Sequence, residues 1–168
     1  EKSFYNGTIV EKEYLSNIAE KWHEYSNYKN KLIYPIMRTL YNLRDYKGLN
    51  SFIDIVKKDP ELDKWLVYDI EHYAALIEIQ FHKRLDKGKL LLSKCIKNLL
   101  YENDNHFLSV KSRIFTTFAN HYSNDKNSKD YIIESIEIKK QLSDKPGLAR
   151  SYGSLSRLLF TENPTSNE

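Results

Sequence analysis

Apolar residues recur with the spacing of α-helices along most of the chain, and this periodicity is the feature that most limits its fold. Between residues 87 and 101, two adjacent apolar rows repeat at i, i+4 and i+8: Leu91, Leu92, Cys95, Ile96, Leu99 and Leu100. Rows of this width are typical of a helix that packs against several neighbours. Convincing strand alternation is absent from the sequence. An all-α fold is therefore expected.

Short polar segments rich in Asp, Asn, Gly and Pro divide the periodic chain where helices most readily end. The divisions predict helices at 11–27, 31–44, 47–57, 66–83, 88–101, 107–122, 128–142 and 147–160. Because the connections are short, consecutive helices should be antiparallel neighbours. Pro35 lies inside the second helix, where an interior proline costs about 3 kcal/mol. That helix is therefore expected to begin later than residue 31 or to kink.

The chain resembles itself when it is shifted by 40 residues. The shift superposes Phe52, Leu92 and Ile132 in second helices, and in first helices Thr39, Ile79, Ala119 and Leu159, together with Ile36, Leu76, Thr116 and Ser156. A constant interval is typical of a solenoid, because one helical hairpin can bury its apolar face only against its neighbours. Coincidence is the alternative, since helical proteins match themselves at many shifts.

Composition and charge leave several classes of function open. Lys and Arg number 26 and Asp and Glu 23, and a net charge of +3 is too small to indicate nucleic-acid binding by itself. Tyrosines and lysines interleave in the first third of the chain, a pattern that suits single-stranded nucleic acid. Acidic residues share that region, however, and an A+T-rich genome produces the same excess. We favour the compositional explanation.

Sequence patterns for catalysis and for metal binding are weak or missing. The single cysteine, Cys95, excludes an intramolecular disulfide, and its place on an apolar stripe predicts burial. His72 and His82 lie roughly 280° apart around a helix and so cannot share a face. His121 is expected to end a helix, where the dipole favours a cation. No glycine-rich phosphate loop is present. We therefore expect no enzyme activity, no cofactor and no metal.

No apolar run approaches the roughly 20 residues that cross a bilayer, and the first residues lack the apolar core of a signal peptide. A cytoplasmic location without membrane partners is expected. A first residue other than Met favours a segment of a longer protein.

Residues 131–160 read YIIESIEIKKQLSDKPGLARSYGSLSRLLF. This stretch resembles the join between two tetratricopeptide repeats, of the longer, 40-residue variety found in kinesin light chains and in bacterial regulatory proteins. The family places small residues where its helices approach closely, and the matching positions are Ala75, Cys95, Ala119, Ser135 and Ser156, with Leu155 and Leu159 beside the last. Leu76 and Ile36 depart from this pattern. The likeness is good over 107–160, fair over 69–101 and weak over 29–60.

The resemblance implies one right-handed α–α superhelix, a solenoid of antiparallel helix pairs, over residues 1–168. The repeats would span about 29–68, 69–108 and 109–148, with a partial repeat at 149–160 and a preceding helix at 11–27. First helices in this family line a concave groove that holds extended peptides or partner helices. The implied function is a protein- or peptide-binding scaffold or sensor module.

The family's groove pattern also implies which side chains line the groove here. It gives Ile70, Tyr73, Ile77 and Gln80, then Val110, Arg113, Thr117 and Asn120, and finally Arg150, Gly153, Arg157 and Phe160. The candidate binding residues are Tyr73, Gln80, Arg113, Thr117, Asn120, Arg150 and Arg157.

Guanidinium groups on adjacent helices suit carboxylate or phosphate, because each can donate two parallel hydrogen bonds. An acidic protein or peptide partner is therefore expected. The structural alternative is that these arginines solvate a face or pair with Glu134 and Glu137. A nucleic-acid-binding helical repeat is the second hypothesis, and an all-helical enzyme is the third and least favoured.

Overall fold

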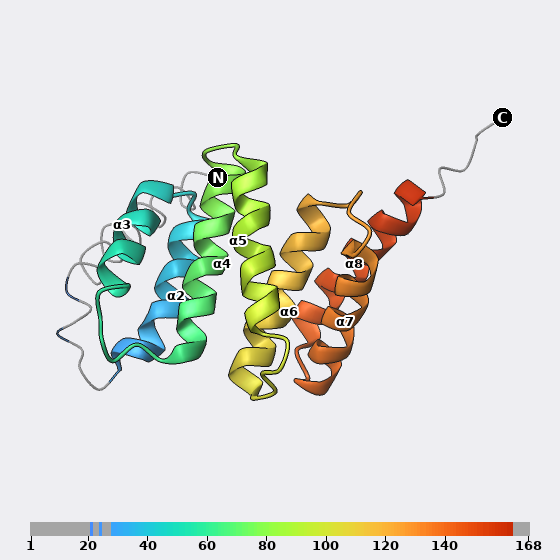
Figure 1. Cartoon of the computed structure of the whole chain (residues 1–168). Coiled ribbons are helices and arrows are strands. Elements are labelled where there is room, and N and C mark those ends of the chain that lie inside the picture. The colour runs from blue at the N-terminus through green and yellow to red at the C-terminus, as the bar shows by residue number, and fades with distance from the viewer. Residues whose placement is uncertain (1–20, 22–23, 25–27, 163–168) are drawn as a thin grey trace, which may run out of the picture. The chain divides into compact units, whose positions relative to one another are not determined.

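The computed structural model describes residues 28–162, together with Lys21 and Glu24. Its helices are α2 (Lys29–Asn42), α3 (Tyr46–Val56), α4 (Lys64–Gln80), α5 (Leu85–Asn98), α6 (Asn105–His121), α7 (Ser128–Gln141) and α8 (Lys145–Glu162) (Figure 1). The described residues contain no strand, which confirms the all-α class. Within the same residues, no helix is both long and apolar enough to span a bilayer.

The predicted helices from residue 31 onward are all found, and each end lies within three residues of its expected position. The predicted helix at 11–27 lies outside the described residues, apart from Lys21 and Glu24. The expected effect of Pro35 on the start of the second helix is wrong. This helix, α2, begins at Lys29, and Pro35 lies in its interior. Burial of Ile33 and Met37, neither of which is exposed to solvent, offsets the cost of the proline.

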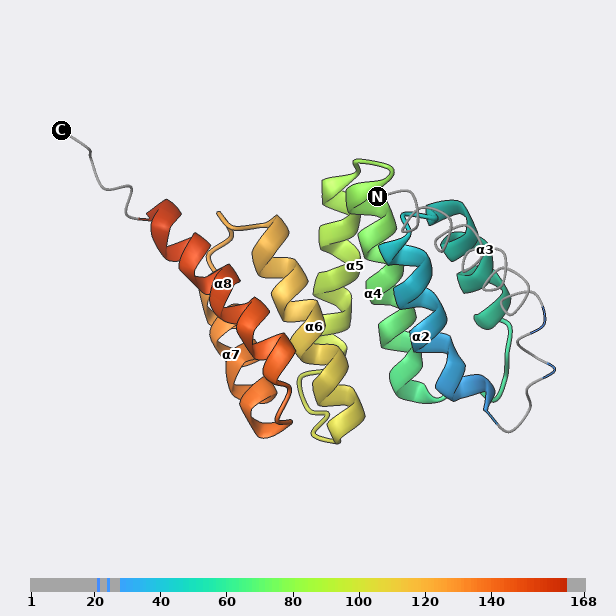
Figure 2. The same cartoon turned by 180° about the vertical axis from the view of Figure 1, so that it is seen from behind.

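The chain divides into two compact units, residues 1–88 and residues 89–168. In the first unit α3 contacts α2, and α4 packs against both. In the second unit α7 contacts α6, and α8 packs against both (Figures 1 and 2). Each unit therefore contains a helical hairpin followed by a third helix that covers it. The single domain expected over 1–168 stays a prediction.

The starts of the helices support the repeat interval in sequence. α4, α6 and α8 begin at residues 64, 105 and 145, which are 41 and 40 residues apart. α2 begins only 35 residues before α4, so the first interval is shorter. This agrees with the weaker likeness of residues 29–60 to the later part of the chain.

Small residues lie at several of the expected close approaches. Ala75, Cys95, Ala119 and Ser135 are all buried, with exposed fractions of 3% or less. In α8 the expected register is wrong: Ser156 is exposed, and Leu159 is 40% exposed. The buried face of α8 instead carries Ser151, Ser154 and Leu158.

The interior of the first unit is largely apolar, although α4 also buries Asp69 and His72. Its core contains thirteen buried residues: Ile33, Ile36, Met37, Leu40, Leu49, Phe52, Ile53, Val56, Leu66, Ile70, Tyr73, Leu76 and Ile77. Tyr41 lies edge-on to Tyr73, with 5.8 Å between ring centroids. Burial of large apolar side chains is thus the main force that holds α2, α3 and α4 together.

Two interhelical loops share the sequence pattern Leu-x-Asp-x-x-Gly-Leu. The pattern covers residues 43–49, from the loop after α2 into the first turn of α3, and residues 142–148, from the loop after α7 into the first turn of α8. The carboxylate of Asp45 accepts the Gly48 N–H at 3.1 Å, and that of Asp144 accepts the Gly147 N–H at 2.9 Å. The residue before each aspartate adopts the left-handed conformation, with φ of 56° and 55°. Both loops end one helix and cap the next within a few residues.

Candidate functional site

The candidate residues of the first unit lie on α4, and the core takes up most of that helix. Ile70, Tyr73 and Ile77 are buried, and Tyr73 is only 5% exposed. Gln80 is partly exposed, and its Oε1 accepts a hydrogen bond from the Tyr46 hydroxyl at 3.3 Å. The groove-lining pattern therefore fails for the three buried residues, because their side chains fill the interior.

The other five candidate residues lie in the second unit, on α6 and α8: Arg113, Thr117, Asn120, Arg150 and Arg157. The two helices contact each other directly. The Arg157 guanidinium donates to Asn120 Oδ1 at 3.2 Å, so this predicted pair does come together. Val110, which the pattern also placed on this face, is buried, whereas Gly153 and Phe160 are exposed.

The glutamates suggested as partners of these arginines bind lysines. Lys111 Nζ lies 2.8 Å from a Glu134 carboxylate oxygen. Lys140 Nζ lies 2.7 Å from Glu137. The Arg113 guanidinium donates to Ser109 Oγ at 2.8 Å, within its own helix. Arg113 and Arg157 thus each donate to neutral side chains on this face.

Beneath this face, a buried cluster joins α6, α7 and α8; we call it the Lys139 network. Its members are Ser112 and Thr116 of α6, Ser135 and Lys139 of α7, and Ser151 of α8. Lys139 Nζ donates to Ser151 Oγ at 2.6 Å and to Thr116 Oγ1 at 2.7 Å. Ser135 Oγ donates to the Ser112 carbonyl at 2.8 Å. Lys139 is 3% exposed, yet its ammonium contacts neutral oxygens and forms no ion pair with a described residue.

The surroundings of Lys139 lower the pKa of its side chain. Burial has the largest effect, and it disfavours the charged form. Asp144 raises the pKa, whereas Arg150 and Arg113 lower it, and the result is a pKa of about 8 in place of 10.5. Two of the predicted site residues, Arg113 and Arg150, thus act electrostatically on Lys139.

Sequence reasoning did not identify the Lys139 network as a unit. Ser135 was expected to be buried, but as a small residue rather than as a hydrogen-bond donor. Lys139 belongs to a Lys-Lys pair, and adjacent positions on a helix point about 100° apart. Lys139 points inward and Lys140 outward. The available signal for a polar cluster was a serine on the inward face of each of three helices, at positions 112, 135 and 151.

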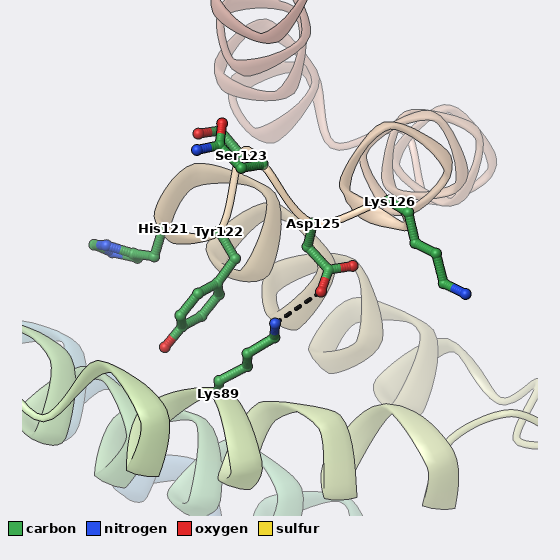
Figure 3. A pocket seen from close by; sticks show the side chains of 7 residues that line it. Lys89, His121, Tyr122, Ser123, Asp125 and Lys126 are labelled. Atoms are coloured by element: carbon green, nitrogen blue, oxygen red, sulfur yellow. Dashed lines mark ion pairs between the residues drawn. The ribbon is translucent and has the colours of Figure 1, made fainter.

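A second feature of this unit is an open depression of about 520 Å³ at the end of α6. Lys89, at the start of α5, and residues 121–126 line it (Figure 3). Lys89 Nζ and the Asp125 carboxylate point toward each other and lie 2.8 Å apart. The hydrogen bond from Lys89 is the main cause of the lowered pKa of Asp125. This ion pair leaves Lys126 as the remaining charged side chain of the lining.

His121 ends α6 as expected, but the expectation of a favoured cation there is wrong. Burial lowers the pKa of its imidazole. The cost of removing the charged form from water therefore outweighs the attraction of the helix C-terminus.

Residues suited to metal ligation or nucleophilic catalysis do not gather elsewhere in the described part of the chain. No group of three or more His, Cys, Asp or Glu side chains is placed to hold a metal ion among these residues. Cys95 is 3% exposed, which confirms its predicted burial. The α6–α8 face, which carries five of the candidate residues, and the Lys139 network beneath it form the candidate site.

Comparisons with protein-family models, with curated proteins and with solved structures find no match to this chain. The resemblance to tetratricopeptide repeats therefore stays a prediction.

Proposed function

We propose that this chain is a protein- or peptide-binding scaffold or sensor module, built as a right-handed solenoid of helix pairs like that of tetratricopeptide repeats. Its binding surface is the face that α6 and α8 share in the second unit. The partner is an extended segment or helix that carries acidic groups. The chain would act without a cofactor, by holding its partner rather than by transforming it.

The observation that carries this proposal is the meeting of first-helix side chains on α6 and α8. α8 packs on both α6 and α7, which is the contact pattern of stacked hairpins. The Asn120–Arg157 hydrogen bond between α6 and α8 supports this surface, and so does the electrostatic effect of Arg113 and Arg150 on Lys139. Guanidinium groups in such an array favour carboxylate-bearing ligands.

Partner capture with matched charge reversals tests the proposal. The immobilised full chain would be used to isolate partners from an extract of its native cell, and the affinity of each partner would then be measured. Arg113→Glu and Arg157→Glu should each weaken binding by about tenfold or more, which corresponds to 1.4 kcal/mol. Lys94→Glu, on the exposed side of α5, is the matched control and should bind as the wild type does. Equal affinities for all variants would discard this face as the binding site.

Nucleic-acid binding is the alternative function, and the gathering of Arg113, Arg150 and Lys139 is the observation in its favour. It predicts binding of a single-stranded oligonucleotide whose affinity falls steeply with salt concentration. Glu134 and Glu137, on the exposed side of α7, would repel either kind of acidic ligand, so the two functions are separated by titration rather than by these charges. A titration with a 12-mer oligonucleotide that shows no binding at low salt would remove the alternative.

A further inference from the structure

The hydrogen-bond partners of Lys139 allow its amine to exist in either protonation state. Its Nζ is bound by the hydroxyls of Thr116 and Ser151, at 2.7 and 2.6 Å. The Thr116 hydroxyl donates to the Ser112 carbonyl at 2.9 Å and so accepts from Lys139, and a neutral amine still has two N–H groups for the two hydroxyl oxygens. A carboxylate partner would instead hold the ammonium form. The three helices can therefore remain packed while Lys139 gains or loses a proton.

The charges around Lys139 come from each element that packs on it. They are Arg113 on α6, Arg150 on α8, and Asp144 in the loop after α7. Asp144 already accepts the Gly147 N–H as a helix cap. Positive charge is thus in excess at this point, and burial together with the two arginines brings the pKa of Lys139 to about 8. A lysine in this range titrates within one pH unit of ordinary cellular conditions.

Arg113 and Arg150 connect this buried group to the proposed binding face. An anionic group held by these arginines would offset their repulsion of the Lys139 ammonium. Linkage is reciprocal, so protonation of Lys139 would strengthen the binding of that anion by the same factor.

We propose that Lys139 is a buried proton switch for the α6–α8 face, whose ammonium form strengthens the binding of an acidic peptide at Arg113 and Arg150 and whose neutral form weakens it. This inference rests on the proposed function, because it assumes that the same face binds the peptide. It goes further by assigning a regulatory role to a residue that the ligand does not touch. Lys139 would not contact the peptide; its charge would change how strongly Arg113 and Arg150 attract it.

The probe for the test is N-acetylated hexaglutamate, with N-acetylated hexaglutamine as the uncharged control. Its binding to the full chain is measured by isothermal titration calorimetry at pH 8.0, in Tris and in HEPES of equal ionic strength. The two buffers differ in ionisation enthalpy, so the difference in observed heat gives the number of protons taken up. We expect uptake of up to about half a proton per peptide, because Lys139 is half-protonated near its pKa of about 8. Binding of hexaglutamate with no proton uptake would overturn the switch and leave the proposed function intact.

Two variants refine the result. Lys139→Met replaces the buried amine with an apolar side chain of similar length, and it should abolish proton uptake and reduce affinity at pH 7 severalfold. Lys140→Met removes the same charge from the adjacent, exposed position and should retain the uptake. Loss of uptake in both variants, or in neither, contradicts the assignment to Lys139. Because the uptake is measured first on the wild type, the test stands even where Lys139→Met fails to fold.

The failure of the proposed function has a different signature. If the wild type binds neither hexaglutamate nor any captured partner in a manner sensitive to Arg157→Glu, the α6–α8 face is not a binding site. If captured partners bind in that manner and hexaglutamate does not, the proposed function survives and the acidic-ligand switch is rejected.

Discussion

Both units pack three helices over buried apolar side chains, but the second also holds a hydrogen-bonded cluster of a lysine and hydroxyls where α6, α7 and α8 meet. In the first unit α2, α3 and α4 meet over large apolar side chains, with Phe52 and Leu66 at 1% and 0% exposure. In the second unit the meeting point of α6, α7 and α8 holds Lys139 among serines and a threonine. The comparison teaches that one helical arrangement tolerates both kinds of interior.

The consequences for stability and function differ accordingly. Burial of apolar area contributes roughly 25 cal/mol per Å² and does not depend on pH. An internal hydrogen bond contributes only about 0.5–1.5 kcal/mol net, but leaving one partner unsatisfied costs more. We therefore expect the first unit to act as a stable support and the second to be the part that responds to ligand and proton concentration.

The matched loop segments show that the two units differ in their interiors and not in these turns between helices. Residues 43–49 and 142–148 have the same pattern and nearly the same backbone conformation, although one follows a first helix and the other a second. The comparison can therefore be tested by substitutions in the two interiors, with the loops as an internal reference.

The largest effect is expected from Phe52→Ala in the apolar core. Removing a fully buried phenylalanine leaves a cavity and should lower the free energy of unfolding by about 3–5 kcal/mol. Urea denaturation followed by circular dichroism measures the change. Leu90→Ala, at a position that is 70% exposed, is the control and should have little effect. Equal losses for the two variants would show that the first unit does not depend on its apolar interior.

A smaller loss is expected from Ser135→Val in the Lys139 network. Valine removes the hydroxyl that donates to the Ser112 carbonyl. It also adds a methyl group at a position that is fully buried. Together these should cost about 1–3 kcal/mol. Ser156→Val places the same side chain on the exposed face of α8 and controls for helix propensity. A more stable Ser135→Val protein would mean that the polar network does not hold the helices together.

The pH dependence of stability separates the two units further. The Lys139 pKa is about 8 in the folded chain and 10.5 in the unfolded chain, so the unfolded state binds more protons between these values. The free energy of unfolding should therefore rise with pH across this window, relative to Lys139→Met. The expected difference between the two pH values is on the order of 1 kcal/mol. Denaturation of both proteins at pH 7.5 and 9.5 gives the difference, and a constant or falling difference contradicts the assignment.

The smallest effects are expected at the two matched loops. Asp45→Ala and Asp144→Ala each remove the cap on a glycine N–H. Each should cost roughly 0.5 to 1 kcal/mol, the lower part of the range for N-caps, because both aspartates are partly exposed. Thermal unfolding of the two variants measures this. A large disparity between them would show that the loops are not equivalent.

Helix positions could be predicted from sequence because short polar segments and apolar periodicity agree along the chain. Pro35 was misread since tertiary burial of Ile33 and Met37 outweighs a local backbone cost. The register of α8 was misread because the 40-residue shift does not carry over to its buried face. Its small residues at 151 and 154 are the ones that face the hairpin.

The candidate site was predicted in part. Side chains that point outward from first helices, such as Asn120 and Arg157, meet as the pattern implied. Tyr73 did not follow, because α4 is buried on most of its circumference. Lys139 was missed because sequence alone does not reveal which of two adjacent lysines points inward, nor that hydroxyls from three helices converge on it.

The central claim is that the binding face lies on α6 and α8, beside Lys139. Hydrogen exchange of the full chain, with and without saturating N-acetylated hexaglutamate at pH 7, tests it most directly. The account predicts slower exchange confined to residues 105–121 and 145–162. Slower exchange confined to α2–α4, or none at a peptide concentration that saturates binding, would contradict it.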